Sequence, residues 1–507
     1  MLAKALSSTV IGIDAHIIEV ETDISYGLPV YTTVGLPETV VKESRERVKA
    51  AIVNSGYSFP DDRITINLAP AGIKKTGTGF DLPIAISVLA ASGIISTEIL
   101  LNYLILGELS LDGAIKPVNG SLSMALAANN AGYKGIIVPY ANRKEAAVVE
   151  NINVYPVKTL AETIDFLKGF IQIEPEKVDI NKLFLDSDNY DEDFSEVAGQ
   201  EHAKRAIEIA AAGGHNLLMI GPPGSGKTML AKRMRSILPP LSFEEAIETT
   251  KIFSIMGMLE KDQALIIKRP FRSPHHTISD AGLIGGGKIP KPGEVSLAQN
   301  GILFLDELPE YKKHVLEVMR QPVEDRKVTI SRAISSITYP SSFMLIAAMN
   351  PCPCGFLSDP KHECKCSHMQ IIRYRSRISG PLLDRIDIHI EVPAVPYKDL
   401  IQNSSGESSK DISKRVIKAR NIQIARFSEE NPKIYNNAQM KNKHIKKYCK
   451  IDTISSRLLE AATDKLGLSA RAYNRILKVA RTIADIGGML DILPEHISEA
   501  IQYQTIK

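Results

Sequence analysis

Residues 221–228 read Gly-Pro-Pro-Gly-Ser-Gly-Lys-Thr and match the phosphate-loop pattern G-x-x-x-x-G-K-[ST] at every fixed position. Glycines at this spacing let the backbone turn tightly, so that its N–H groups face a polyphosphate. The pattern assigns Lys227 to the β- and γ-phosphates of ATP and the Thr228 hydroxyl to Mg²⁺. The residues predicted to bind the nucleotide are Gly221, Pro222, Pro223, Gly224, Ser225, Gly226, Lys227 and Thr228.

The segments on either side of this loop fit the same interpretation. Residues 216–220 are an apolar run that predicts a buried parallel strand. Residues 229–234 continue as a helix, whose N-terminus favours an anion. The alternative is a glycine-rich turn that matches by chance, but a chance match does not require a flanking strand and helix.

A second nucleotide signature follows at residues 301–307. Four apolar residues, 302–305, predict a buried strand that ends in two carboxylates. Asp306 is the candidate for holding Mg²⁺, mostly through water, and Glu307 is the candidate for polarising the attacking water. Any core strand can end in acids, but at this distance after a phosphate loop the pattern indicates ATP hydrolysis.

Two further polar residues complete the predicted site. Residues 342–349 predict another buried strand, and Asn350 after it fits a sensor beside the γ-phosphate, or else a plain turn before proline. Residues 380–387 resemble the arginine-finger segment of the magnesium-chelatase and replicative-helicase branch of AAA+ ATPases. That resemblance implies that Arg385 acts on ATP held by the next subunit. A surface ion pair with Asp384 or Asp387 is the alternative.

Two segments between these motifs allow more than one interpretation. Residues 327–332 and 336–339 alternate like hairpin strands. In the same AAA+ branch such a hairpin projects into a central channel, so Arg332 is either a DNA contact or an ordinary exposed arginine. For His275 and His276 we favour a packing or subunit-contact loop over a metal site, because adjacent residues rarely face the same way on a strand.

Four of the five cysteines lie within residues 352–366, namely Cys352, Cys354, Cys364 and Cys366. Two close thiol pairs suit tetrahedral Zn²⁺, which would hold a loop that has no core of its own. The C-x-C pairs are tighter than the usual finger spacing, and free cytosolic thiols are the alternative. His362 and His368 are possible substitutes for a thiolate. So few cysteines in a chain of 507 residues do not indicate a disulfide scaffold.

Residues 1–170 predict an α+β unit, with strands within 9–22 and at 64–68 and helices at 40–55 and 82–91. Residues 75–79 and 108–120 resemble the Lon-type protease fold, which uses a Ser–Lys pair. By that alignment Gly79 and Leu122 occupy the Ser and Lys positions. We therefore expect a proteolytically inactive domain for binding or assembly, with a plain structural domain as the alternative. The acidic residues 171–193 predict a linker.

Residues 396–507 predict a helical lid. From Ala394 onward the chain carries 20 Lys and Arg against 12 Asp and Glu. This excess, with the basic run 441–447, hints at an anionic partner, although a solvated helical surface is the commoner cause. Arg471 fits a second sensor that meets the γ-phosphate, and a plain helix-surface arginine is the alternative.

The whole chain resembles the ComM/YifB family of magnesium-chelatase-like AAA+ ATPases. The fold class that this implies is α/β. An AAA+ P-loop core over 194–395, with the Cys-rich loop 352–366, carries a Lon-protease-like N-terminal domain and a lid of the magnesium-chelatase C-terminal type. The resemblance implies a homo-hexameric ring that hydrolyses ATP to move DNA strands, as in branch migration or helicase-like recombination of incoming DNA. A chelatase-type ATPase that remodels a protein partner is the alternative.

Composition and hydropathy exclude some other classes. The chain is 44% hydrophobic and 23% charged, as in globular proteins, and its length predicts about two to four domains. The longest apolar stretch, 82–96, is shorter than the roughly 20 residues of a membrane helix and contains a proline. The first residues lack a basic region followed by a clean apolar core. We therefore expect a cytoplasmic protein with no membrane partner.

Overall fold

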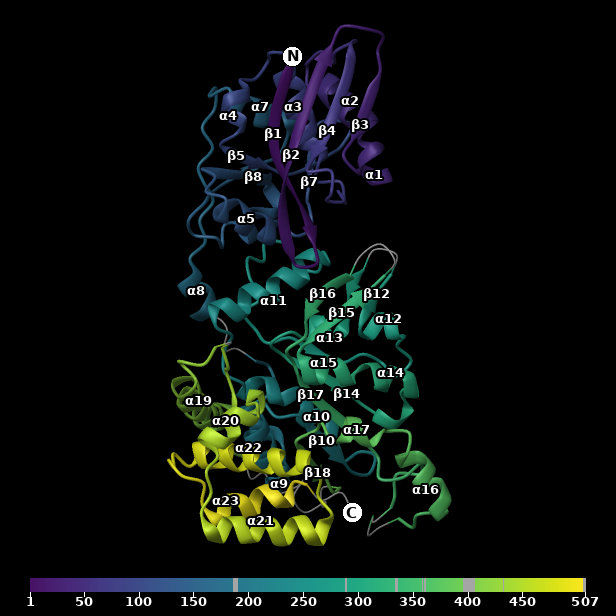
Figure 1. The fold of residues 1–507 in the computed structure, drawn as a ribbon, viewed down its shortest axis with the longest axis vertical. Coiled ribbons are helices and arrows are strands. Elements are labelled where there is room, and N and C mark those ends of the chain that lie inside the picture. The colour runs from purple at the N-terminus through teal and green to yellow at the C-terminus, as the bar shows by residue number, and fades with distance from the viewer. Residues whose placement is uncertain are drawn as a thin grey trace. The chain divides into compact units, whose positions relative to one another are not determined.

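The computed structural model describes residues 1–185, 190–287, 290–332, 336–357, 359, 362–394, 406–431 and 433–504. The chain forms two compact units, whose helices and strands are labelled in Figure 1. Unit 1 contains Met1–Leu185 and Phe243–Ile267, and unit 2 contains Asp186–Ser242 and Lys268–Lys507. Within the described ranges, no helix is both long enough and apolar enough to cross a membrane.

Unit 1 is built on a mixed seven-stranded sheet with the order β3-β4-β2-β1-β5-β8-β9. β1 (Leu2–Ile11) and β2 (Asp14–Ser25) form a long antiparallel hairpin, since the two residues between them include Gly12, which suits a tight turn. β5, β8 and β9 continue the sheet in parallel. The remaining bounds are β3 (Tyr31–Val34), β4 (Arg63–Ala69), β5 (Tyr103–Ile105), β8 (Gly135–Pro139) and β9 (Asn153–Val157).

Buried helices pack on this sheet and confirm the predicted α+β unit. Every residue of α3 (Asp81–Ala91) is buried, and the helix packs on β1, β2 and α2 (Ser44–Asn54). α5 (Ser121–Asn130) packs on β2 and β8, and α7 (Leu160–Leu167) packs on β9. Leu122, at the position of the Lon lysine, is fully buried in α5. Neither Leu122 nor Gly79 can supply a nucleophile or a base.

Helix α11 (Phe243–Ile255) belongs to unit 1, although the sequence places it after the phosphate loop. The Ser254 hydroxyl donates to the buried Glu145 carboxylate, and Lys251 pairs with Asp14 at 3.1 Å. A buried carboxylate requires such donors because its desolvation is costly. Residues 243–267 therefore interrupt the core that the sequence predicts over 194–395.

Unit 2 contains a parallel five-stranded sheet with the order β11-β14-β17-β10-β18. Its strands are β10 (Leu217–Ile220), β11 (Phe271–Arg272), β14 (Ile302–Leu305), β17 (Met344–Met349) and β18 (Ile388–Glu391). α9 (Glu201–Gly213) and α10 (Lys227–Arg233) flank β10 in the sequence. The carboxyl ends of parallel strands meet at one edge, which is where open α/β sheets bind ligands. The loops after β10, β14 and β17 therefore bring the predicted motifs together.

The described residues after 405 confirm the predicted helical lid. Its helices include α19 (Ser409–Arg426), α20 (Asn442–Tyr448), α21 (Thr453–Leu466), α22 (Ala470–Ile486) and α23 (Pro494–Gln502). Their apolar side chains belong to the same buried cluster as those of α9 and β10. The lid therefore shares one core with the nucleotide-binding sheet.

A buried ion-pair network joins two lid helices and gives a stability prediction. The fully buried Asp485 accepts hydrogen bonds from Arg426 of α19 at 2.8 Å and from Arg481 of α22 at 3.1 Å. Removing one partner of a buried network leaves charges uncompensated, so Asp485→Ala should lower the free energy of unfolding by about 3–5 kcal/mol. Urea unfolding of the full chain, followed by circular dichroism, measures the shift. The exposed Asp491→Ala is the control, and equal midpoints for the two variants would contradict the prediction.

Candidate nucleotide-binding site

The phosphate loop connects β10, which ends at Ile220, to α10, which begins at Lys227. Gly224 and Gly226 have φ angles of +76° and +86°. A side chain with a Cβ is strained in this left-handed region, so these two turns require glycine. β10 lies between β17 and β18. The loop is thus positioned at the carboxyl edge of the sheet, with the ends of two neighbouring strands beside it.

Lys227 is buried, and the groups that accept hydrogen bonds from its ammonium group are uncharged oxygen atoms. Its Nζ donates to the Gly221 and Pro222 carbonyl oxygens at 2.7 and 2.9 Å and lies 3.3 Å from Asn350 Oδ1. Burial lowers the pKa of the Lys227 ammonium group, although the Asp306 carboxylate partly offsets the effect. Within the described residues, no carboxylate forms an ion pair with this ammonium group. An anion such as a phosphate would supply the missing charge.

The two predicted Mg²⁺ residues meet in the structure. The Thr228 hydroxyl donates to Asp306 Oδ2 at 2.7 Å, and the Glu307 N–H donates to Asp306 Oδ1 at 2.9 Å. A hydroxyl and a carboxylate are the oxygen ligands that Mg²⁺ accepts, together with water and phosphate oxygens. The structure therefore brings Lys227, Thr228, Asp306 and Asn350 to one place, as the sequence predicted.

Glu307 has a partner that sequence reasoning missed. Glu307 follows β14 in a left-handed conformation with φ of +52°, and Oε2 lies 3.3 Å from His276 Nδ1. His276 follows β11, which is the strand next to β14. The His275 and His276 rings lie 4.1 Å apart, because the strand ends at Arg272 and the pair lies in a loop. The argument from strand alternation therefore does not apply, and His276 contacts the predicted catalytic carboxylate.

Arg385 lies near the amino-terminal ends of the parallel strands, whereas the phosphate loop of the same chain lies at their carboxyl ends. It precedes β18, which runs parallel to β10 with Ile388 paired to Leu217. The Asn216 side chain, just before β10, donates to the Arg385 carbonyl oxygen at 2.9 Å. The four residues of β10 span about 13 Å, which is longer than an arginine side chain. The Arg385 side chain therefore cannot reach the phosphate loop of its own chain in this conformation.

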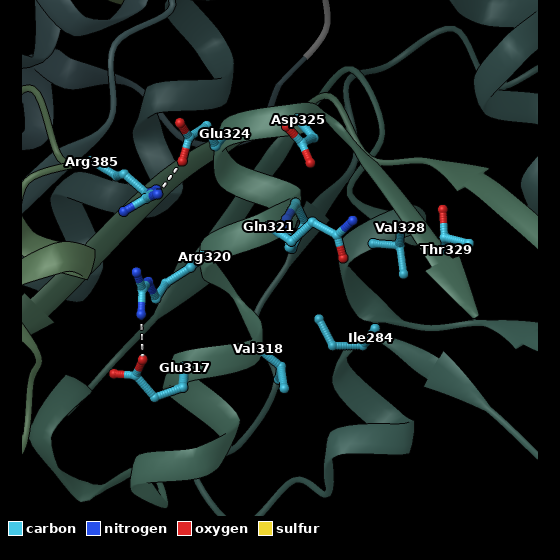
Figure 2. Close-up of a pocket in the computed structure, with 11 residues that line it drawn as sticks. Ile284, Glu317, Val318, Arg320, Gln321, Glu324, Asp325, Val328, Thr329 and Arg385 are labelled. Atoms are coloured by element: carbon cyan, nitrogen blue, oxygen red, sulfur yellow. Dashed lines mark hydrogen bonds and ion pairs between the residues drawn. The ribbon is translucent and has the colours of Figure 1, made fainter. Parts of the chain in front are cut away.

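Figure 2 shows how the Arg385 guanidinium is held. It pairs with Glu324, rather than with Asp384 or Asp387. It also donates to the Pro381 carbonyl oxygen at 2.6 Å. This pair lines a cavity of about 460 Å³ together with Arg320, which pairs with Glu317 at 2.9 Å. Ion pairs near the surface contribute only about 0–1 kcal/mol. In the Arg385–Glu324 pair the Glu324 side chain is 55% exposed and the Arg385 side chain is 13% exposed, so only the glutamate is well solvated.

Two other predicted site residues lie apart from this cluster. Arg471 is exposed in the first turn of α22, and within the described residues no hydrogen bond joins its side chain to the phosphate loop. One turn later, Arg475 donates to the Leu383 carbonyl oxygen at 3.2 Å and so ties the lid to the Arg385 segment. Arg332 is exposed after β15 (Lys327–Ser331), which pairs with β16 (Ser336–Pro340). The hairpin turn, residues 333–335, lies outside the described residues.

The basic run 441–447 is partly neutralised within the lid. Lys447 pairs with Glu430 at 3.2 Å, Lys443 lies 3.5 Å from it, and the buried His444 also lies 3.2 Å away. Hydrogen bonds from Tyr448 and Lys447 lower the pKa of Glu430 to about 2. Part of this charge therefore stabilises the fold and is less available to an anionic partner.

The four clustered cysteines form a group that can hold a metal ion. Their Sγ atoms all lie within 4.8 Å of one another, and Cys352 is buried. The N–H of Phe356 donates to the Cys354 sulfur and lowers the pKa of this thiol to about 6. In the part of the chain that the structure describes, these cysteines are the one group of three or more such side chains whose ligand atoms lie close enough to hold one ion.

The sequence is similar to those of several known bacterial proteins over its whole length. The chain is 46% identical to YifB of Salmonella typhimurium over 507 residues, which cover 100% of this chain and 97% of that protein. It is 43% identical to the competence protein ComM of Haemophilus influenzae over 509 residues, which cover 100% and 98% of the two chains.

The chain belongs to the ComM/YifB family.

Three protein-family descriptions match separate ranges of this ComM/YifB-family chain. "Magnesium chelatase, subunit ChlI" matches residues 193–400, and "Magnesium chelatase, subunit ChlI C-terminal" matches residues 406–504. "Subunit ChlI of Mg-chelatase" matches residues 20–142. Lon protease 2 of Bacillus subtilis is 31% identical over 157 residues, which cover 28% of this chain and 27% of that protein. The fold is thus a magnesium-chelatase-like AAA+ core with a Lon-like α+β domain and a helical lid.

Proposed function

We propose that this ComM/YifB protein is an Mg²⁺-dependent ATPase. The observation that carries the proposal is the convergence of Lys227, Thr228 and Asp306 at one edge of the sheet. Lys227 would bind the β- and γ-phosphates, and Thr228 and Asp306 would hold Mg²⁺, which neutralises charge on the phosphates. Glu307 would accept a proton from the attacking water, and Asn350 would orient that water. Arg471 is the proposed lid sensor, which requires the lid to move.

The position of Arg385 supports a ring of identical subunits. A guanidinium that lies too far from its own phosphate loop can complete the site of a neighbour. An interface that joins one surface of a protomer to a different surface of the next one forms a ring when the rotation between neighbours closes, and an open helix when it does not. We propose a homo-hexamer, in which each Arg385 leaves Glu324 and contacts the γ-phosphate bound by the adjacent protomer.

The proposed work of this ring is to move DNA strands in the cytoplasm. The similarity to a competence protein over the full length supports branch migration or helicase-like recombination of incoming DNA. The exposed Arg332 at the end of β15 is the candidate contact with a threaded strand. The domain at residues 1–170, the linker 171–193 and the lid 396–507 are proposed as parts of this motor, the first without proteolytic activity.

A second function deserves a test because two observations favour it. The family descriptions that match residues 193–400 and 406–504 are those of a magnesium chelatase subunit. Glu430 neutralises part of the basic run that would otherwise support DNA binding. A chelatase-type ATPase would remodel a protein partner instead, and DNA would not stimulate it.

The test of the DNA function is the ATPase rate with and without forked DNA, at several salt concentrations. We expect forked DNA to stimulate the rate. Arg332→Ala should lose part of this stimulation, and the slope of log affinity against log salt should fall by about 0.7, because one contact to a single strand is lost. Lys327→Ala, an exposed cation on the same strand, is the matched control and should retain both. No stimulation by any form of DNA would favour the protein-remodelling alternative.

The cysteine cluster is proposed to hold a structural Zn²⁺. Four thiolates with no carboxylate among them are the donor set that zinc prefers over Mg²⁺. The residues that would bind it are Cys352, Cys354, Cys364 and Cys366.

A further inference from the structure

The cysteine cluster begins two residues after Asn350. β17 ends at Met349, Asn350 and Pro351 follow, and Cys352 is the first ligand candidate. Asn350 Oδ1 lies 3.3 Å from Lys227 Nζ. Only Pro351 therefore separates the first cysteine of the cluster from a residue that contacts the phosphate loop.

Three of the four sulfur atoms are spaced as in a tetrahedral zinc site, and the Cys366 sulfur lies within 4.8 Å of them. Cys352 Sγ lies 3.3 Å from Cys354 Sγ and 3.7 Å from Cys364 Sγ, and the latter two sulfurs are 3.6 Å apart. A Zn–S distance of about 2.3 Å in a tetrahedron places the sulfurs about 3.8 Å apart. The distances are also far longer than a disulfide bond, which is about 2.05 Å. The cluster is thus close to the shape that zinc requires, before any rearrangement.

The described part of this loop buries little apolar surface. Among the described residues of 352–366, only Cys352 and Gly355 are buried. The Phe356 and His362 rings contact each other, with centroids 4.8 Å apart, near the surface. A loop that buries so little apolar surface cannot offset the entropy lost in ordering it. The four ligands are therefore the main candidates for fixing its shape.

Gly355 joins this loop directly to the phosphate loop. Its φ is +86°, and a Cβ at this position would lie 2.5 Å from Pro223 Cδ. The backbone of the cysteine loop therefore packs against the phosphate loop more closely than any side chain would allow. The Gly355 N–H also donates to the Cys352 carbonyl oxygen at 3.0 Å, which links this packing to the first ligand.

We propose that zinc bound by the four cysteines holds the phosphate loop in the shape that binds ATP. The contact runs on one side through Gly355 to Pro223 and on the other through Asn350 to Lys227. Zinc and ATP would then bind cooperatively, and by linkage each would raise the affinity of the other by the same factor. This inference rests on the proposed function, because it requires ATP to bind at Lys227.

The decisive variant is Gly355→Ala, which keeps all four thiols but breaks the packing on Pro223. We expect it to retain one zinc per chain, measured by elemental analysis, and to bind a fluorescent ATP analogue at least fivefold more weakly. Gly488→Ala is the matched control, because Gly488 also has a positive φ, +69°, but no atom lies within 4 Å of the added Cβ. ATP affinity that is equal in the two variants would overturn the proposal.

A second experiment measures the rate of zinc loss from the parent protein and compares it with that of two variants. Saturating ATP should slow the transfer of zinc to a competing chelator at least fivefold in the parent protein and leave it unchanged in Lys227→Ala. Cys449→Ala, which changes a buried cysteine outside the cluster, should behave as the parent. A zinc-free protein that binds ATP normally would refute the inference and leave the ATPase proposal standing. A protein that binds zinc but no ATP would instead refute the proposed function.

Discussion

Arg385→Ala is expected to lower the kcat of ATP hydrolysis by about 10³- to 10⁵-fold, which is the range for loss of an arginine finger. The reason is the position of the residue, before β18 and opposite to the phosphate loop that follows β10. ATP affinity should change little, since the binding residues of the same protomer are intact. Steady-state kinetics and nucleotide titration separate the two effects.

Mixing two inactive variants tests whether Arg385 acts between subunits. Lys227→Ala retains the finger but loses the phosphate contact, and Arg385→Ala retains the phosphate contact but loses the finger. In mixed rings about one quarter of the sites would combine an intact loop with a neighbour's intact finger, so activity should reappear. Arg377→Ala is the control for the arginine, because Arg377 is half exposed and pairs with Glu310 at 2.9 Å. A mixture as inactive as its components would contradict the shared site.

Glu307→Gln is expected to bind ATP nearly normally and to hydrolyse it about 10²- to 10⁴-fold more slowly. An amide of the same shape cannot accept the proton of the attacking water, and general-base catalysis contributes a factor of this size. Thr228 and Asp306, which would hold Mg²⁺, keep their mutual hydrogen bond in this variant. Single-turnover hydrolysis measures the chemical step, and analogue binding measures affinity.

The control for this variant is Glu310→Gln, which removes a nearby exposed carboxylate on the same connection after β14. It should hydrolyse ATP within about threefold of the parent. Substitutions of exposed residues rarely change the free energy of unfolding by more than about 0.5 kcal/mol, so the site should keep its structure. Similar rates for Glu307→Gln and the parent would remove Glu307 from the mechanism and leave another group to act as the base.

The sequence could predict that Lys227, Thr228, Asp306 and Asn350 lie together, because the signals for their strands are local. The strands 302–305 and 344–349 are apolar runs that end directly before Asp306 and Asn350, and the apolar strand 217–220 ends directly before the phosphate loop. A parallel sheet then brings those residues to one edge without further information. The convergence of Thr228 and Asp306, 78 positions apart, follows from this rule alone.

The contacts that the sequence did not predict arise between segments with no shared pattern. Glu324 holds Arg385 across 61 positions, and His276 contacts Glu307 across 31. The packing of Gly355 on Pro223 depends on a backbone conformation that any glycine permits. The predicted ATPase core 194–395 includes α11, but the polar anchor of this helix, Glu145, lies in unit 1. The hydrophobic periodicity of a helix shows which of its faces is apolar, but it does not show which part of the protein packs against that face.

The placement of α11 decides how this protein can be divided for separate study. The main chain passes between the two units at three places, after residues 185, 242 and 267. A fragment that starts at residue 186 would carry α11 without Glu145, and its buried residues, such as Ile252, would face water and promote aggregation. A fragment ending at residue 185 would lack the same helix. Separate expression of the halves therefore requires grafting residues 243–267 onto the first half and closing the gap in the second half with a short glycine-rich bridge.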